Sequence, residues 1–468
     1  MAETVNKTTA ELRALLTKGQ TEGQKALAKE GRLCARDRMS LIFDEGTFVE
    51  VGAYIGRKRT ELDKEADDSF EPVITGYGAV NGTLVYAFSQ DYSRLHGALG
   101  EMHAKKIVSI IKMAAKANAP IIGVFDSAGA KILEGVDALA GYGSIMCALE
   151  DADVPKIAVV AGICGGSTAV MAEMFDVVVG AKKTGKLFAA LSGKTKDAIS
   201  VDPSLIDIVC EDDTAATTKA RDLIKYFAGE TETADDINRV LDIEGFFAND
   251  KYDIHDIIAH TFDAGSFTEL GGESAKSMVT GLATIGGKPV VVIANNPSYK
   301  DGALCTGAAK KAIFALETAM TAELPVVTLV DGNGIGDNKD LEEKGFARIL
   351  ARLASMYAQR NCEYVNLPSV TVTLGLSYGT AYTVMGSKAL TGGIALALDR
   401  ARIAPMSPDS AVAFLDEVKN ESKHKETAKA WADRYASPLE AAKSGHIDDI
   451  IDSAELRQRI GAALAMLL

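Results

Sequence analysis

Two short segments rich in small residues have the composition of turns that stabilise a developing negative charge. They are Gly162-Ile-Cys-Gly-Gly-Ser-Thr and Gly375-Leu-Ser-Tyr-Gly-Thr-Ala, and each follows an apolar run typical of a buried strand. Small residues between a strand and a helix leave main-chain N–H groups without partners and let another molecule approach closely. Two such donors at the positive end of a helix suit an oxygen that becomes anionic. Tight strand-helix packing explains one such turn equally well, but two turns of the same kind favour catalysis.

A third candidate segment follows another predicted buried strand, Ile121–Phe125. After Asp126 it offers a main chain suited to a planar ligand and a lysine suited to a phosphate, namely Ser127, Ala128, Gly129, Ala130 and Lys131. The alternative is that Asp126 caps the next helix and that the lysine is solvated. Ser167, after the double glycine, does not lie in a G-x-S-x-G elbow and has no His placed by sequence to activate it, and the cysteines have no spacing typical of zinc, so neither a serine hydrolase at Ser167 nor a metal site is indicated.

Composition limits the classes of protein that this chain can represent. Of 468 residues, 47% are apolar and 24% are charged, which is enough apolar material for buried cores. The net charge of −14 argues against a nucleic-acid-binding protein. The six cysteines form no CxxC pair, and the N-terminus lacks an apolar signal core. A cytoplasmic enzyme is therefore expected.

The elements that must position these turns occur twice in the chain. Four segment pairs match in order: 39–52 with 258–271, 76–90 with 281–295, 120–129 with 325–334, and the segments that begin at Val154 and Leu367. In the first copy, strands Val73–Val80 and Leu84–Phe88 meet at an Asn-Gly turn and precede a helix at Glu101–Ala117. The prediction is an α/β chain of two homologous domains, 1–228 and 251–468, joined by a linker at 229–250, with a helix near Thr217–Ala228.

The residues from about Arg36 to Leu468 resemble the carboxyltransferase subunits of biotin-dependent acyl-CoA carboxylases and decarboxylases. The resemblance is carried by GTFVEVG, GYGAVNGTLVYAFSQDYSRLHGALGEMHAKKI, DSAGAKILEGVDALAGYG and GICGGSTAV in the first half. In the second half it rests on SYGTAYTVMGSKAL and SPLEAAKSGHIDDIIDSAELR.

This resemblance implies two tandem crotonase-like (ββα superhelix) domains, with acyl-CoA on the first and carboxybiotin, delivered by a separate carrier protein, on the second. It implies that the amides of Gly165 and Gly166 polarise one carbonyl and that the amides of Thr380 and Ala381 polarise the other. One carbonyl belongs to the thioester and the other to the biotin ureido group, and the resemblance leaves open which pair of amides serves which. The loop Ser127–Lys131 is expected to lie against the CoA. At the second turn, Gly379, Tyr382 and Thr383 are expected to bind the cofactor.

The resemblance also implies partners: a biotin carrier, a biotin carboxylase or a membrane decarboxylase subunit, and further copies of this chain as a dimer or hexamer. Propionyl-CoA and methylmalonyl-CoA are the expected substrates, with acetyl- and glutaconyl-CoA as alternatives. Thr380 stands where the family commonly has glycine, and its usual basic residue before the second turn is missing. A weakly active scaffold that holds a biotin carrier is therefore the alternative function.

Overall fold

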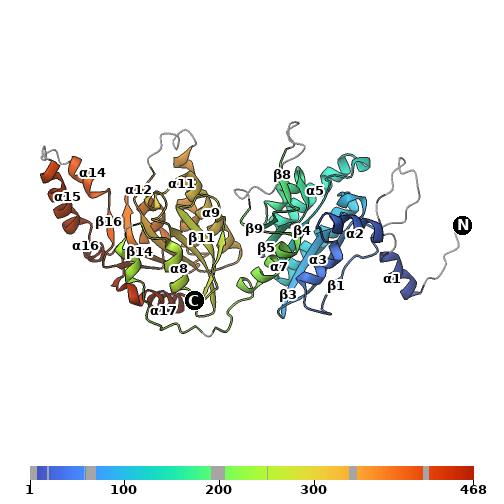
Figure 1. The fold of residues 1–468 in the computed structure, drawn as a ribbon, viewed down its shortest axis with the longest axis horizontal. Helices are drawn as coiled ribbons and strands as arrows, with labels where there is room; N and C mark the ends of the chain where they lie inside the picture. Colours follow the sequence, from blue (N-terminus) through green and yellow to red (C-terminus); the bar gives the residue numbers. More distant parts are fainter. Residues whose placement is uncertain are drawn as a thin grey trace. The chain divides into compact units, whose positions relative to one another are not determined.

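The structure is a computed structural model that describes residues 8–17, 20–56, 58, 70–190, 206–233, 235–249, 251–336, 345–414 and 421–468. The chain divides into two compact units, Met1–Phe227 and Ala228–Leu468. In Figure 1 the first unit runs from blue to green and the second from yellow-green to red. No described helix combines the length and apolar character needed to cross a membrane.

The first unit is a seven-stranded sheet covered by helices on both faces (Figure 1). Its sheet order is β1-β2-β3-β4-β5-β7-β9, and β6 pairs with β8 in a separate ribbon. The strands are β1 Val49–Glu50, β2 Val73–Val80, β3 Thr83–Gln90, β4 Ile121–Phe125, β5 Lys156–Val160, β6 Ile163–Gly165, β7 Val177–Ala181, β8 Lys186–Phe188 and β9 Ile208–Cys210. The helices are α1 Thr9–Thr17, α2 Gln20–Lys29, α3 Ala35–Ile42, η1 Leu95–Gly97, α4 Glu101–Ala117, η2 Ile132–Glu134, α5 Val136–Glu150, α6 Ser167–Ala172, α7 Asp213–Leu223 and η3 Ile224–Tyr226.

The local elements predicted for this unit are confirmed. Strand β2, helix α4 and strand β4 have the expected bounds, and β3 extends the expected strand at both ends. Asn81 and Gly82 both adopt positive φ, at 49° and 81°, as a two-residue hairpin turn between twisted strands requires. Ala104, Ile107, Ile111 and Ala114 on α4 are buried in the core of this unit, as their helical spacing predicts.

The second unit has an eight-stranded sheet with the order β10-β11-β12-β13-β14-β15-β17, and β16 pairs with β14. The strands are β10 Thr268–Leu270, β11 Met278–Ile285, β12 Lys288–Asn295, β13 Val326–Gly332, β14 Ser369–Tyr378, β15 Ile394–Leu398, β16 Arg402–Ala404 and β17 Asp449–Ile451. The helices are η4 Glu244–Ala248, α8 Ile254–Thr261, η5 Lys300–Gly302, α9 Thr306–Thr321, α11 Phe346–Arg360, α12 Gly379–Ala381, η6 Tyr382–Gly386, α13 Lys388–Thr391, α14 Pro408–Phe414, α15 Glu421–Tyr435, α16 Pro438–Lys443, η7 Ser453–Glu455 and α17 Leu456–Leu467.

The two units repeat each other down to single hydrogen bonds. In the first unit Gly76 pairs with Glu50 at the edge of the sheet. In the second unit Gly281 pairs with Glu269 at the corresponding edge, as the matched segments predict. After β3 and β12 the chain makes the same loop: the Leu99 amide donates to the Gly129 carbonyl at 2.9 Å, and Leu304 donates to Gly334 at 3.0 Å. Two sheets with equivalent strand orders and equivalent loops therefore present equivalent strand ends.

The segment predicted as a linker, 229–250, belongs instead to the second unit. The Thr231 amide donates to the Gly287 carbonyl at 2.9 Å, and the Leu241 amide donates to Ala454 at 2.9 Å. Ile243 is fully buried in the core of that unit. The segment is rich in Asp and Glu, but these main-chain hydrogen bonds and its buried apolar residues fix it on the second unit. The helix expected near Thr217–Ala228 is shifted toward the N-terminus, as α7 and η3.

Candidate active site

The first small-residue turn connects β5 to α6 through the short strand β6. Gly166 precedes the helix with φ 59° and ψ −127°, a backbone conformation that side chains disfavour, so glycine is required there. The helix then begins at Ser167, and the amides of its first turn, from Ser167 and Thr168, have no partner within the helix. These two amides are the donors that this turn presents.

The expected donor at Gly166 is wrong. Its amide donates to the Phe188 carbonyl at 2.9 Å and extends the ladder between β6 and β8. Successive amides of a strand point to opposite sides, so the Gly165 amide faces away from β8. Gly165 remains a predicted donor, whereas Gly166 supplies the turn itself. The sequence showed two adjacent glycines but not which one a neighbouring strand would engage.

The second turn lies at the end of β14. Gly379 has φ 57°, which matches the 59° of Gly166, and α12 begins there. Thr380 and Ala381 are in the first helical turn, where amides have no intrahelical partner. By this correspondence the counterparts of Thr380 and Ala381 are Ser167 and Thr168. The threonine side chain at 380 does not remove the amide.

The residues that follow the second turn have different environments. Tyr382 is partly buried against the small core formed around Ala397 and Ile403, and burial raises the pKa of its hydroxyl. Thr383 is exposed, and its hydroxyl donates to the Gly379 carbonyl at 3.3 Å. Only Thr383 of the two therefore has an exposed side chain beside the turn.

The loop after β4 lies next to the first turn. The Ser127 amide donates to the Ile163 carbonyl at 2.8 Å, and the Ser127 hydroxyl donates to the Gly97 carbonyl at 2.7 Å. Ala128 is exposed, Gly129 and Ala130 are half-buried, and Gly129 has φ 109°. The structure thus brings the predicted loop and the predicted turn together at one edge of the sheet.

Lys131 does not offer its charge to a phosphate, which corrects that prediction. Its side chain is buried, and the ammonium group donates to Glu134 Oε1 at 2.6 Å and to the Lys58 carbonyl at 2.8 Å. Glu134 in turn accepts the Glu101 amide at 2.6 Å and so caps the start of α4. Lys131 therefore fixes the loop to α4 through Glu134.

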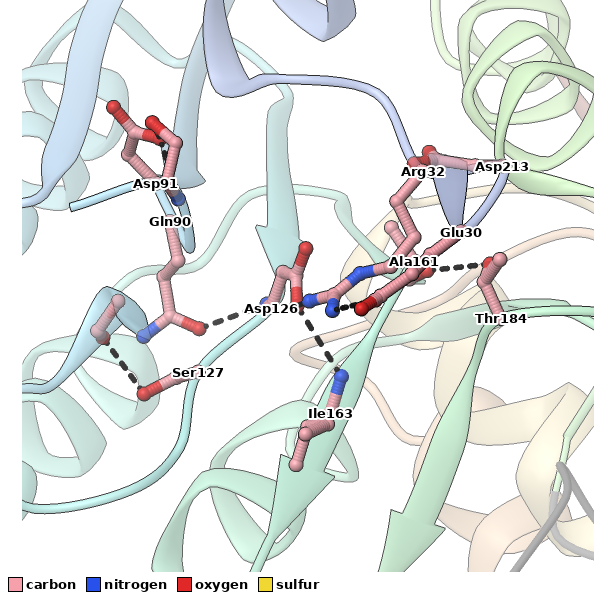
Figure 2. A network of polar contacts seen from close by, with 12 residues as sticks. Glu30, Arg32, Gln90, Asp91, Asp126, Ser127, Ala161, Ile163, Thr184 and Asp213 are labelled. Atoms are coloured by element: carbon pink, nitrogen blue, oxygen red, sulfur yellow. Dashed lines mark hydrogen bonds and ion pairs between the residues drawn. The ribbon is translucent and has the colours of Figure 1, made fainter. Parts of the chain in front are cut away.

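Asp126 does not cap a helix either; it is fully buried behind the first turn (Figure 2). Its Oδ1 accepts the Ile163 amide at 3.3 Å, and its own amide donates to Gln90 Oε1 at 3.1 Å. Two guanidinium groups neutralise the carboxylate: Arg32 pairs with Oδ1, and Arg38 Nη2 lies 2.8 Å from Oδ2.

Arg38 is itself fully buried and also pairs with Asp213 at 2.8 Å. Burial disfavours its charged form, but the charges of Asp126 and Asp213 outweigh burial and raise the pKa of the guanidinium above its ordinary value. The two buried carboxylates, Asp126 and Asp213, are therefore matched by two guanidiniums, and the exposed Glu30 also pairs with Arg32 at 3.0 Å. This pairing matters here because an unpaired carboxylate would oppose an anion at the neighbouring turn.

Asp331 occupies the equivalent place in the second unit. Its Oδ1 accepts the Leu376 amide at 2.7 Å, and its Oδ2 accepts the Tyr252 hydroxyl at 2.9 Å. Arg400 Nη1 lies 3.5 Å from the same oxygen. Burial raises the pKa of the Asp331 carboxyl above its ordinary value. The two units thus place a buried carboxylate behind each turn and surround it with different partners.

The two buried carboxylates explain why each turn begins with a glycine. A Cβ on Gly162 would overlap the Asp126 carboxylate, and a Cβ on Gly375 would overlap that of Asp331. These two glycines therefore make room for a side chain of the protein. Neither aspartate was predicted as a site residue, although each follows a predicted buried strand at matched places of the repeat.

Comparisons with known proteins agree with this geometry. Residues 27–468 match the family model described as the carboxyl transferase domain. The chain is 33% identical to methylmalonyl-CoA decarboxylase subunit alpha of Propionigenium modestum, over 93% of this chain and 90% of that one. It is 31% identical to the propionyl-CoA carboxylase beta chain of Cereibacter sphaeroides, over 94% and 91%. A crystal structure of transcarboxylase 12S, a hexamer with hydrolysed methylmalonyl-coenzyme A bound, matches with a TM-score of 0.89 and 28% identity, over 98% of this chain and 94% of that one.

Proposed function

The chain belongs to the carboxyl transferase family, and we propose that it moves a carboxyl group between methylmalonyl-CoA or propionyl-CoA and biotin on a separate carrier protein. The family and the acyl-CoA type follow from relatives that match nearly the whole chain. The observation that carries the catalytic proposal is the pair of amide turns, one in each unit, at equivalent strand ends.

In this proposal each turn holds one carbonyl oxygen. The amides of Ser167 and Thr168, with Gly165 beside them, serve one oxygen, and those of Thr380 and Ala381 serve the other. One of these oxygens belongs to the thioester, which becomes an enolate, and the other to the biotin ureido group; the assignment of turns to carbonyls stays open. Backbone donors fixed before reaction stabilise the charge without reorganising, which is the main source of rate in such sites.

The donor set fits a thioester and a ureido carbonyl, because two N–H groups at a helix start match the lone pairs of one oxygen. Biotin, when bound, supplies the nitrogen that accepts the carboxyl group and the proton that the acyl carbon receives. The protein supplies the two turns, and the loop Ser127–Ala130 provides main chain for the CoA side. We place acyl-CoA on the first unit and biotin on the second, and we class both units as crotonase-like.

We further propose that the working form is a homo-oligomer, a dimer or hexamer, because the first unit exposes apolar residues beside its candidate site. Ile132 is 89% exposed and Val136 is 74% exposed, and Leu133 and Leu139 accompany them on η2 and α5. A cluster of exposed apolar side chains is typical of an interaction surface. The hexameric relative supports this assembly. A carrier protein, together with a biotin carboxylase or a membrane decarboxylase subunit, completes the proposed system. Six free cysteines suit the cytoplasm as its compartment.

The test is carboxyl transfer by the purified full chain from methylmalonyl-CoA to free biotin. The C–C bond to the carboxyl group breaks, an N–C bond forms, and the biotin proton moves to the acyl carbon, so propionyl-CoA accumulates. Malonyl-CoA and glutaconyl-CoA run in parallel to test the other acyl groups. If no acyl-CoA is consumed in a biotin-dependent manner by the assembled protein, the enzyme proposal fails and the scaffold alternative takes its place.

A further inference from the structure

The strands that lead into the two turns share an irregularity. In the second unit, Val330 pairs with Thr373, but the next pair along the ladder is Gly332 with Ser377. Two steps along β13 thus face four steps along β14, and residues 374–376 bulge away from the ladder. A bulge leaves main-chain groups without ladder partners.

In the first unit β5 stops at Val160 and the chain resumes as β6 at Ile163. There Val160 pairs with Phe125, and the Ser127 amide then bonds to the Ile163 carbonyl at 2.8 Å. Between these two contacts the chain therefore advances further along the β5 side than along the β4 side. Both amide turns therefore follow a bulged segment.

Side chains hold the same two main-chain atoms of each bulge. In the first unit the Ile163 amide donates to Asp126, and the Ala161 carbonyl accepts the Thr184 hydroxyl at 2.7 Å (Figure 2). In the second unit the Leu376 amide donates to Asp331 at 2.7 Å, and the Leu374 carbonyl accepts Arg400 Nη1 at 3.2 Å.

The matched repeat places Ala161 opposite Leu374 and Ile163 opposite Leu376. The Thr184 hydroxyl in the first unit and the Arg400 guanidinium in the second unit donate to equivalent carbonyl oxygens. Because unrelated side chains satisfy the same carbonyl, packing around one particular residue does not explain the arrangement. What the two units share is the position of the bulge. In both, the turn begins three residues beyond the amide that bonds to the aspartate: Gly166 follows Ile163, and Gly379 follows Leu376.

We propose that two pairs of side chains, Asp126 with Thr184 and Asp331 with Arg400, are positioning residues that fix the direction of the amide N–H groups in the two turns. We call each pair a clamp. This inference rests on the proposed function and deepens it. Each clamp fixes one carbonyl and one amide on either side of a glycine, Gly162 or Gly375. The peptide planes between the ladder and the helix start then have one orientation. The clamp touches neither substrate; it acts through the main chain, and misplacing amide donors is costly because catalysis depends on their geometry.

The test uses Thr184→Val, which replaces the hydroxyl by a methyl group of similar size, with Thr184→Ser as the rescue that restores a donor. Thr47→Val is the control, because the Thr47 hydroxyl also donates to a main-chain carbonyl, that of Asp44 at 2.8 Å, and in addition accepts the Ala79 amide at 3.1 Å. That site lies beside the β2–β3 hairpin, at the other ends of the strands. Asp331→Asn tests the clamp of the second unit.

Two readouts are measured on the full chain. In the methylmalonyl-CoA and biotin assay, Thr184→Val lowers kcat by about tenfold, with a smaller change in KM. This is the effect expected when one hydrogen bond that orients the amide donors is lost. Thr184→Ser recovers most of the loss, and Asp331→Asn lowers kcat at least as far. Thr47→Val lowers thermal stability at least as much as Thr184→Val, because it removes two hydrogen bonds, but leaves kcat within twofold of the starting protein.

The second readout is amide hydrogen exchange of the peptide 161–170, which needs no activity. Exchange there is faster in Thr184→Val and unchanged in Thr47→Val. If exchange and kcat are both unaffected by Thr184→Val, or if Thr47→Val lowers kcat equally, the positioning inference is wrong. If the unaltered chain has no activity while exchange responds as expected, the proposed function fails and the clamp stands.

Discussion

Replacing Ser167 by proline deletes one predicted oxyanion donor and little else. Ser167 is the first residue of α6, a position where proline is favoured and its missing N–H is not part of the helix. Gly166 has φ 59° and ψ −127°, the mirror image of an extended conformation, which is compatible with a following proline because only the helical region is disfavoured there. The fold therefore accommodates Ser167→Pro.

The expected loss follows from the energy of one such donor. Removing a single oxyanion-hole donor costs about 3 kcal/mol of transition-state stabilisation, and each 1.36 kcal/mol is a factor of ten, so kcat falls by about a hundredfold or more. The KM for methylmalonyl-CoA changes less, because the ground-state carbonyl carries less charge than the enolate. The measurement is propionyl-CoA formation with free biotin under saturating conditions.

Ser167→Ala is the control, since it removes the hydroxyl and keeps the amide; its kcat stays close to that of the original chain. Thermal unfolding and sedimentation establish that both variants fold and assemble alike. Thr380→Pro makes the same deletion in the second unit. A Ser167→Pro protein that is folded and retains kcat within threefold would refute the assignment of this amide as a donor.

The remaining predictions concern stability and assembly. Gly375→Ala places a methyl group on the carboxylate of Asp331 and costs about 1–3 kcal/mol in urea denaturation; Gly245→Ala, with open space around its Cβ position, is the neutral control. Burial raises the pKa of Glu71 from 4.5 to about 7, so its protonated form favours the folded state and this contribution is lost as pH rises from about 4.5 through 7. Glu71→Gln is therefore more stable than the original chain at pH 8, by up to about 3 kcal/mol, with little difference at pH 4.5; an equal effect at both pH values contradicts this. Ile132→Asp puts a charge on the exposed apolar surface and shifts sedimentation toward smaller species; an unchanged oligomer removes that surface from the interface.

Much of the fold can be predicted from the sequence, because the patterns that define its elements involve residues close together in the chain. The Asn81-Gly82 turn, the apolar spacing along Glu101–Ala117 and the short apolar run Ile121–Phe125 each depend on neighbours in the chain, and the structure has these elements at the expected places. The repeat was also readable, since two copies of one fold keep the same order of patterns. The segment 229–250 was not recognised as part of the second domain because its main-chain amides bond to carbonyls far along the chain, such as those of Gly287 and Ala454, and Ile243 is buried among residues of that distant core.

The sequence by itself determined which segments form the candidate site: two turns of small residues and one loop, each after a buried strand. It did not determine which amides are available, because Gly166 is engaged by Phe188 across a separate ribbon. Nor did it show that Lys131 is neutralised by Glu134, or that Asp126 and Asp331 lie behind the turns. Composition and spacing report which groups are present within a few residues of one another. The direction of an N–H and the partner of a buried charge depend on which distant strands come together, and that is decided only when the sheets form.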